Sequence, residues 1–296
     1  MSNHGNAIPA QYPEFAGMVQ HKLWPALKDR LGEDEYKSLI AKPNEVTKRL
    51  REAFTKKDGN DIVVPTSPFF ANEEVPSNYG YPSGYTVKPV CEQLVAFGKY
   101  FPNLDGREVL ALSKELPPPP QGAEGWFVAP KRERVAKTEN EAVEHVLDLI
   151  GKTRTLHNYR KGELGLKHIK LSERTAAALQ MLGEKQKGDF LLIPAQFGLM
   201  HRGRSVRRVR EVIANSSQFG LGSVIVGSML LSHPERLVAW EQLHIDCPGD
   251  EYSPDADGKF SRAPVFRWRD GGVEFLTYGV GDVSAGYGAA SAFLPQ

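Results

Sequence analysis

Residues 189–213, DFLLIPAQFGLMHRGRSVRRVREVI, decide the fold that we expect for this chain. The apolar run Phe190–Ile193 is typical of a strand covered on both faces, with a buried helical turn as the alternative. Pro194 and Gly198 then indicate that regular pairing ends nearby. Ser205 is a good helix N-cap, and after it one apolar helical face is formed by Val206, Val209, Val212 and Ile213. The stretch therefore predicts a strand, a glycine-containing loop and a helix.

The start of this expected helix is rich in arginine. Arg207 and Arg208 occupy the first turn, where the positive end of a helix ordinarily favours Asp or Glu. Free N–H groups, a glycine loop and forked guanidinium groups together suit a phosphate. We therefore expect an anionic ligand to be bound by Arg202, Gly203, Arg204, Ser205, Arg207 and Arg208. The alternative is that the arginines pair with acids of the same chain, with Asp250, Glu251 and Asp257 as candidates.

Charge is unevenly distributed along the chain, although the formal net charge is only +1. Fourteen Lys or Arg residues and four Asp or Glu residues lie in the segment 152–210, whereas residues 211–296 hold five basic and eleven acidic ones. The basic block, in which His157, Tyr159 and His168 alternate with basic residues, suits nucleic acid. A solvated loop face is the alternative. The acidic block is a possible partner for it within the chain.

The acidic block also supplies candidates for chemistry. Clustered carboxylates suit Mg²⁺, and the candidate ligands are Asp246, Asp250 and Glu251. The candidate catalytic residues are His201, Asp246 and Cys247. The ordinary pKa of histidine lies near neutrality, so His201 could carry a proton beside bound phosphate. A structural cysteine and a solvated acidic turn are the alternatives. The chain contains no phosphate-loop, dinucleotide-binding, nucleophile-elbow or zinc-helix motif.

Composition and pattern predict the fold class. With 296 residues, 41% of them hydrophobic and 25% charged, the chain can bury an ample core. We predict an α/β or α+β fold, with a helical N-terminal region and a mixed sheet with flanking helices in the C-terminal half. That sheet should contain Phe190–Ile193 and a hairpin over 265–278, whose turn is Arg269–Gly272. The apolar run after Gly222 predicts a core helix or a buried strand, and Pro234 predicts the start of a further helix.

Pro117–Pro120 form a stiff spacer, which we interpret as the boundary between two regions. Residues 1–116 are expected to be mainly helical and to carry an aromatic loop at 65–89. Residues 121–296 are expected to form the α/β region with the basic block and the C-terminal hairpin. Aromatic side chains in a loop can stack on bases, but we favour the interpretation that they attach this loop to its own domain.

The cellular location is predicted from what the sequence lacks. No apolar run approaches the roughly 20 residues that span a bilayer, and no basic segment followed by an apolar core begins the chain. Cys91 and Cys247 are the two cysteines, a number compatible with a reducing compartment. We expect a cytoplasmic protein without a membrane partner.

The segment PAQFGLMHRGRSVRR, residues 194–208, and the final FLPQ, residues 293–296, resemble uncharacterised hypothetical proteins of environmental and candidate-phylum bacteria. The resemblance extends over roughly the last two thirds of the chain. It implies a bacterial origin, and it carries no activity, substrate or catalytic residue that could be transferred to this chain.

Three functional hypotheses follow from the sequence. The first is a protein that binds an anionic ligand, either nucleic acid or a phosphorylated molecule. The second is a metal-dependent phosphoesterase or nuclease that uses Mg²⁺. The third is a structural or interaction protein whose charged blocks pair with each other.

Overall fold

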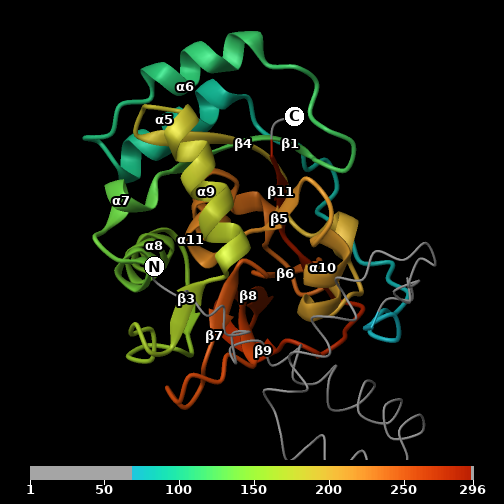
Figure 1. The fold of residues 1–296 in the computed structure, drawn as a ribbon. Helices are drawn as coiled ribbons and strands as arrows, with labels where there is room; N and C mark the ends of the chain where they lie inside the picture. Colours follow the sequence, from blue (N-terminus) through green and yellow to red (C-terminus); the bar gives the residue numbers. More distant parts are fainter. Residues whose placement is uncertain (1–68, 295–296) are drawn as a thin grey trace, which may run out of the picture. The chain divides into compact units, whose positions relative to one another are not determined.

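The computed structural model describes residues 69–294 (Figure 1). The helical region expected before residue 69 lies outside these described residues. Among them, none of the helices is long and apolar enough to cross a membrane.

The described chain mixes helices and short strands up to residue 236 and contains only strands from residue 244 onward. Its α-helices are α5 (Val90–Tyr100), α6 (Arg107–Leu112), α7 (Arg132–Val135), α8 (Glu139–Thr153), α9 (Glu173–Lys185), α10 (Val206–Ile213) and α11 (Ser223–Ser232). Its 3₁₀ turns are η2 (Ser113–Glu115), η3 (Leu199–His201) and η4 (Pro234–Arg236). Its strands are β1 (Gly125–Pro130), β2 (Leu156–Asn158), β3 (Ile169–Leu171), β4 (Phe190–Gln196), β5 (Gln218–Gly220), β6 (His244–Asp246), β7 (Asp250–Tyr252), β8 (Arg262–Arg269), β9 (Gly272–Gly279), β10 (Tyr287–Ala289) and β11 (Ser291–Phe293).

The strands form two sheets, and the fold is of the α+β class. The first sheet is antiparallel, with the order β1-β4-β11-β5. The second is mixed: β10-β6-β8-β7-β3 run in order, β9 pairs with β8, and β2 pairs with β9. In this sheet β6 and β10 are parallel, as are β2 and β9.

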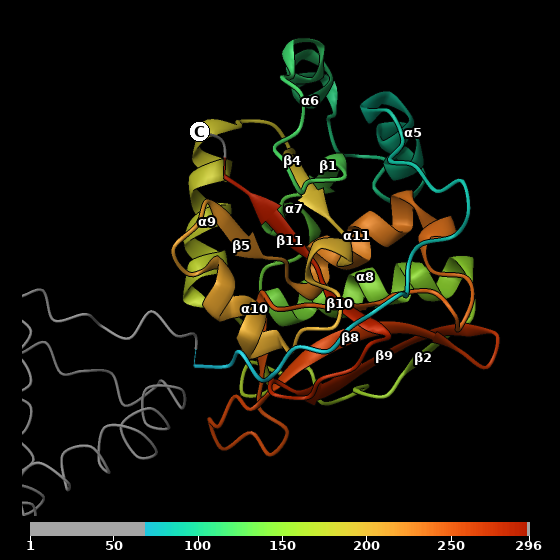
Figure 2. The same cartoon turned by 90° about the vertical axis from the view of Figure 1, so that its right-hand side faces the viewer.

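The expected strand and hairpin are both confirmed, but they do not share one sheet. Phe190–Ile193 lies in β4 of the antiparallel sheet, whereas β8 and β9 form the hairpin of the mixed sheet. Helices α8 and α11 lie between the two sheets (Figure 2). Helix α11 is apolar on all sides and therefore needs apolar neighbours on all sides, whereas a single sheet would cover only one side of it.

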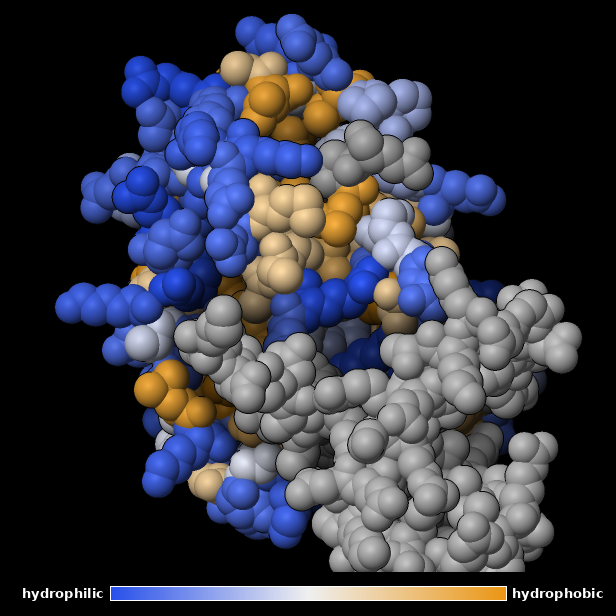
Figure 3. Space-filling view, in the orientation of Figure 1, coloured by the Kyte–Doolittle hydropathy of each residue, from blue (hydrophilic) through white to orange (hydrophobic). Residues whose placement is uncertain are grey.

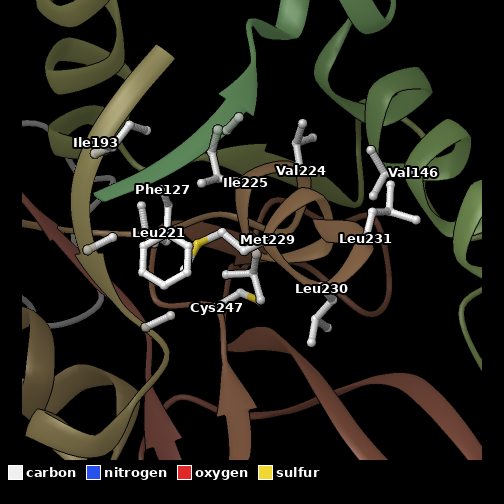
Figure 4. Close-up of a cluster of buried hydrophobic side chains, with 14 of the residues drawn as sticks. Phe127, Val146, Ile193, Leu221, Val224, Ile225, Met229, Leu230, Leu231 and Cys247 are labelled. Carbon is white, nitrogen blue, oxygen red and sulfur yellow. The ribbon is translucent and has the colours of Figure 1, made fainter. Parts of the chain in front are cut away.

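Helix α11 is that central helix, and all ten of its residues are buried. Met229 and Leu230 are fully buried among side chains from both sheets and from α8 (Figure 4). A Cβ added at Gly227 would lie 2.5 Å from a methyl group of Val146 in α8, so glycine permits this close helix packing. Ser228 Oγ donates to Val224 O at 2.7 Å, which satisfies this hydroxyl within the helix itself.

Local signals elsewhere give the expected helix starts. Ser205 caps α10 and accepts a hydrogen bond from Arg208 N. At the start of α8, Thr138 N donates to Glu141 Oε2 at 3.1 Å, as the capping-box pattern predicts. The prediction of a helix from Pro234 is wrong. The structure has a single 3₁₀ turn there, because the chain becomes extended at Leu237.

The four prolines do not separate two domains. Phe97 and Val109, in α5 and α6, precede the prolines and are buried in the same core as β1 and β4. The compact unit that contains them is Phe70–Gln296. The expected division at 116–121 therefore falls inside this unit, because the apolar faces of α5 and α6 need the cover that β1 and β4 provide.

Candidate functional site

The arginine-rich start of α10 lies against a segment from much earlier in the chain. Arg207 Nε lies 2.8 Å from each carboxylate oxygen of Glu73, and Arg207 Nη2 forms an ion pair with the same group. Ser205 Oγ donates to Glu73 Oε2 at 2.6 Å. The Glu73 side chain is only 10% exposed. The N-cap and the first turn of α10 therefore bind a carboxylate of the chain itself.

Glu74 and Glu211 are the partners of the neighbouring arginines. Arg204 Nε lies 3.1 Å from Glu74 Oε2, and Arg208 Nε donates to Glu74 Oε1. Arg208 Nη1 also donates to Glu211 Oε2 at 2.8 Å. The positive charge at a positive helix end thus has its anion within the protein, as the alternative interpretation of the sequence required.

The acids in these pairs are not those that we expected from the sequence. Glu251 pairs with Lys170 at 3.1 Å, and Asp257 pairs with Lys259 at 3.0 Å. The acids at 73 and 74 reach α10 because a β-bridge aligns residue 74 with residue 204. Such a bridge joins segments that are distant in sequence, and no local pattern indicates it.

Gly203 serves the contact between these two segments. Its φ is +73°, and a Cβ there would collide with the carbonyl oxygen of Val75. Val75 N donates to Gly203 O at 2.8 Å. Arg202 differs from the other arginines of the loop, because it is exposed and its Nη1 donates to Tyr79 O at 3.2 Å.

The aromatic loop is attached to its own domain, as we favoured from the sequence. Tyr81 Oη donates to Glu124 Oε1, and the guanidinium of the buried Arg236 lies 3.7 Å from the centre of the Tyr81 ring. The Tyr85 ring packs edge-on against His233.

His201 is fully buried. Its Nδ1 lies 3.3 Å from Arg204 Nη1, which can only donate, so Nε2 carries the proton and donates to Gln218 Oε1 at 3.1 Å. Burial lowers the pKa of His201 to about 4, which keeps the ring neutral. A proton carrier must contact its substrate, and this ring is enclosed by protein.

The other two catalytic candidates are also enclosed. Burial, together with the charge of Asp282, raises the pKa of Asp246 to about 7. Cys247 lies in the core beside α11, and burial raises the pKa of its thiol well above the ordinary value (Figure 4). A reactive cysteine needs the opposite shift, because the thiolate is the nucleophile.

The candidate magnesium ligands contact different partners. Glu251 faces Lys170, whereas Asp250 accepts hydrogen bonds from Ser223. The acid whose charge acts on Asp246 is Asp282. Within residues 69–294, no group of three or more His, Cys, Asp or Glu side chains could hold a metal ion.

A cleft of about 610 Å³ lies between α9 on one side and α7, the start of α8 and the start of α11 on the other. The apolar part of its wall is formed by Leu171, Ala176, Leu179, Leu191, Val224 and Ile225. Figure 3 shows mostly hydrophilic residues on the left of this face, where Figure 1 places α7. Of the apolar wall, residues 191, 224 and 225 are buried.

Asp250 lies behind the inner end of this cleft, at the N-terminus of α11. Its Oδ2 accepts a hydrogen bond from Ser223 N at 2.6 Å and another from Ser223 Oγ. Its Oδ1 is buried and has no hydrogen-bond partner among residues 69–294. Gly222 lines the cleft, and a Cβ there would collide with this oxygen. The unpartnered oxygen therefore lies next to Gly222, at a point where the cleft wall has no side chain.

Glu139, in the first turn of α8, is the second carboxylate of the cleft. Burial raises its pKa to about 8, the charge of Asp250 adds to the rise, and Arg132 opposes it. Burial also raises the pKa of Asp250 to about 6, while Ser223 and Arg210 oppose that rise. Glu139, which lines the cleft, and Asp250, which lies next to Gly222 of the cleft wall, thus both have raised pKa values, and the charge of Asp250 disfavours ionisation of Glu139.

The cations nearest the cleft have other partners. Lys131 Nζ donates to Gly183 O at 3.2 Å and also to Gln186 O. Arg132 Nη1 donates to Lys137 O at 2.6 Å. No hydrogen bond or ion pair joins either cation to Glu139 within the described chain.

Sequence reasoning identified Asp250 as a candidate but missed Glu139. Glutamate in a first helical turn is common, because it favours the helix dipole, so its identity carried no signal. The two acids are brought close together only by the packing of α11 between the two sheets.

Comparisons with protein-family models, with curated proteins and with solved structures found no match to the chain.

The contact between Glu73 and α10 predicts a loss of stability on neutralisation. In Glu73→Gln the ion pair with Arg207 is lost, and the free energy of unfolding should fall by about 2 kcal/mol, the value typical of charge-assisted hydrogen bonds. Unfolding in denaturant measures this change in the free energy of unfolding. Glu144→Gln, at an exposed position of α8, is the control and should change stability little. Equal stability of the two variants would show that the contact contributes nothing.

The raised pKa of Glu139 predicts the pH dependence of stability. Because the folded pKa, about 8, exceeds the ordinary 4.5, the folded state holds this proton more tightly than the unfolded state. Stability should therefore fall as pH rises from about 4.5 through 8. Glu139→Gln cannot ionise, so its melting temperature should fall less than that of the wild type between pH 6 and pH 9. Parallel pH profiles for the two proteins would contradict a raised pKa.

Proposed function

We propose that this protein binds a small organic molecule in the cleft between α7 and α9. The observation that carries the proposal is a cleft of about 610 Å³ with an apolar wall, which is lined by Glu139 and lies next to the buried carboxyl group of Asp250. Ligand sites in proteins are mainly apolar clefts of this size, in which a few polar groups fix the orientation of the ligand. Perturbed carboxyl groups in such a cleft are a further mark of a functional site.

The cleft has parts suited to each end of such a ligand. Leu179 in α9 and Leu191 in β4 offer an apolar wall for a ring or a chain. Glu139 offers a carboxyl group that is largely protonated at neutral pH, which can both donate and accept a hydrogen bond. Such a group can also serve as a general acid or base, since its pKa lies near the pH of a cell.

A bulky side chain at the mouth of the cleft tests this proposal. Ala176 and Ala177 are exposed neighbours on α9, but only Ala176 lines the cleft. We expect a set of ring-containing organic fragments, screened by ligand-observed NMR, to include binders of the wild type and of Ala177→Trp. The same fragments should bind Ala176→Trp at least tenfold more weakly. Fragments that bind both variants alike, or no binding fragments, would refute the proposed site.

A polyanion, nucleic acid above all, is the second ligand that we propose, at the loop before α10. The observation that favours it is Arg202, which is exposed and forms no ion pair with a described acid. A polyanion that contacted Arg204 or Arg208 would have to displace Glu74 from them.

Bacterial origin and a cytoplasmic location remain predictions from the sequence.

The salt dependence of binding tests this second proposal. Replacing Arg202 with glutamine should weaken binding of a 20-nucleotide DNA and reduce the slope of log K against log salt by roughly 0.7 to 0.9. Arg269→Gln, at an exposed arginine in the mixed sheet, is the control. An unchanged slope for Arg202→Gln would exclude a phosphate contact at this residue.

A further inference from the structure

We infer that the ligand of the cleft carries a positively charged ammonium group, which binds at the inner end of the cleft beside Glu139 and Asp250. This inference rests on the proposed function and adds the chemical class of the ligand to it. Three features of the described residues carry it: an acceptor without a donor, a second carboxylate without a hydrogen-bond or ion-pair partner, and nearby cations whose hydrogen bonds go to other groups.

The acceptor without a donor is Asp250 Oδ1. Asp250 is fully buried, and both hydrogen bonds to its carboxylate, from Ser223 N and Ser223 Oγ, reach Oδ2. A buried acceptor without a partner costs free energy, so native proteins seldom leave one unexplained. Gly222 lines the cleft and has no side chain, and a Cβ there would lie 2.5 Å from this oxygen and 2.8 Å from a methyl group of Leu171. An ammonium group bound in the cleft beside Gly222 would therefore place its positive charge close to this carboxylate.

The second carboxylate is Glu139. It lines the cleft, and no described residue donates a hydrogen bond to it or forms an ion pair with it. Its ionisation is opposed by burial and by the charge of Asp250, and the charge of Arg132 offsets these two effects only in part. A cation bound beside the two carboxylates would favour the ionised form of both, because it is attracted to each of them.

Protein cations do not fill this role. Lys131 and Arg132 line the cleft, but they donate to backbone carbonyls near the ends of α9 and α7. The other charged side chains of the cleft wall are Glu133, Glu184 and Lys187, all exposed. Behind Asp250, Arg210 donates to the backbone oxygens of Pro248 and Asp250, and Glu251 pairs with Lys170.

The cleft favours an organic ammonium over a metal ion. A divalent ion takes six or more oxygen ligands when it is Ca²⁺, or an octahedral set when it is Mg²⁺. Two carboxylates and apolar walls provide far fewer, and no metal-binding group of three side chains exists in the described chain. An alkyl or aryl ammonium instead uses both parts of the cleft, because its tail contacts the leucines and its head contacts the acids.

Binding should displace a proton. At pH 7 the Glu139 carboxyl group is mostly protonated. When an ammonium binds beside it, the O–H bond of Glu139 breaks, the proton passes to the buffer, and the carboxylate pairs with the ligand cation. The amine keeps its own proton, because alkylammonium groups have pKa values of about 10. Binding is therefore expected to release close to one proton at pH 7.

Four probes test the inference by calorimetry: 2-phenylethylamine, its neutral isostere 2-phenylethanol, the anion 3-phenylpropionate, and Mg²⁺ alone. We expect the amine to bind the wild type at least tenfold more tightly than the alcohol. The preference should disappear in Glu139→Gln, and both ligands should bind weakly to Ala176→Trp. Heats measured in buffers with different ionisation enthalpies should show proton release with the amine in the wild type and none in Glu139→Gln.

The outcomes separate the inference from the proposed function. Equal binding of amine and alcohol, or tighter binding of the anion, refutes the ammonium, while loss of binding in Ala176→Trp still supports the cleft. Binding of Mg²⁺ that Glu139→Gln abolishes, without binding of the amine, makes the site a metal site and overturns the inference. No binding of any probe at a site sensitive to Ala176→Trp overturns the inference, and with a negative fragment screen it overturns the proposed function too.

Discussion

The buried N-terminus of α11 is the constraint on which the rest of this fold depends. A helix start leaves backbone N–H groups without partners, and here it lies inside the protein, where water cannot satisfy them. Asp250 at the start of β7 supplies the acceptor for Ser223 N. Gly222 and Gly249 permit the close approach of the two segments, since a Cβ at either position would collide with the other segment. One carboxylate thus joins the central helix to the mixed sheet.

The same cap produces the candidate site. Asp250 uses Oδ2 for the helix start, and its other oxygen, which has no hydrogen-bond partner among the described residues, lies next to Gly222 of the cleft wall. The N-terminus of α8 lies beside it, so Glu139 is placed near a carboxylate that the fold requires. Two acids that serve helix starts become interacting acids because both helices are buried between the sheets. The acceptor that the start of α11 requires and the pair of interacting acids beside the cleft therefore have the same physical cause, which is the burial of both helices between the sheets.

The arginine-rich loop shows a different relation between charge and structure. Positive groups at a positive helix end require an anion, and Glu73 and Glu74 supply it. This contact attaches the chain at residue 73 to α10, and the aromatic residues that follow continue the attachment through Tyr81 and Glu124. The arginine cluster, which stands out in the sequence, is largely paired with acids of the same protein. No pattern in the sequence indicated the cleft.

The sequence by itself determined the elements whose signals are local. The Ser205 cap, the Thr138 capping box, the apolar strand at Phe190 and the hairpin at Asp270–Gly271 depend on residues close together in the chain. Only the tertiary structure decided which sheet each strand joined, because apolar strands carry no mark of their partner. It also decided which acid pairs with which arginine, and that Glu139 lies near Asp250. Ion pairs and shared burial depend on distances in space, which a pattern along the chain does not encode.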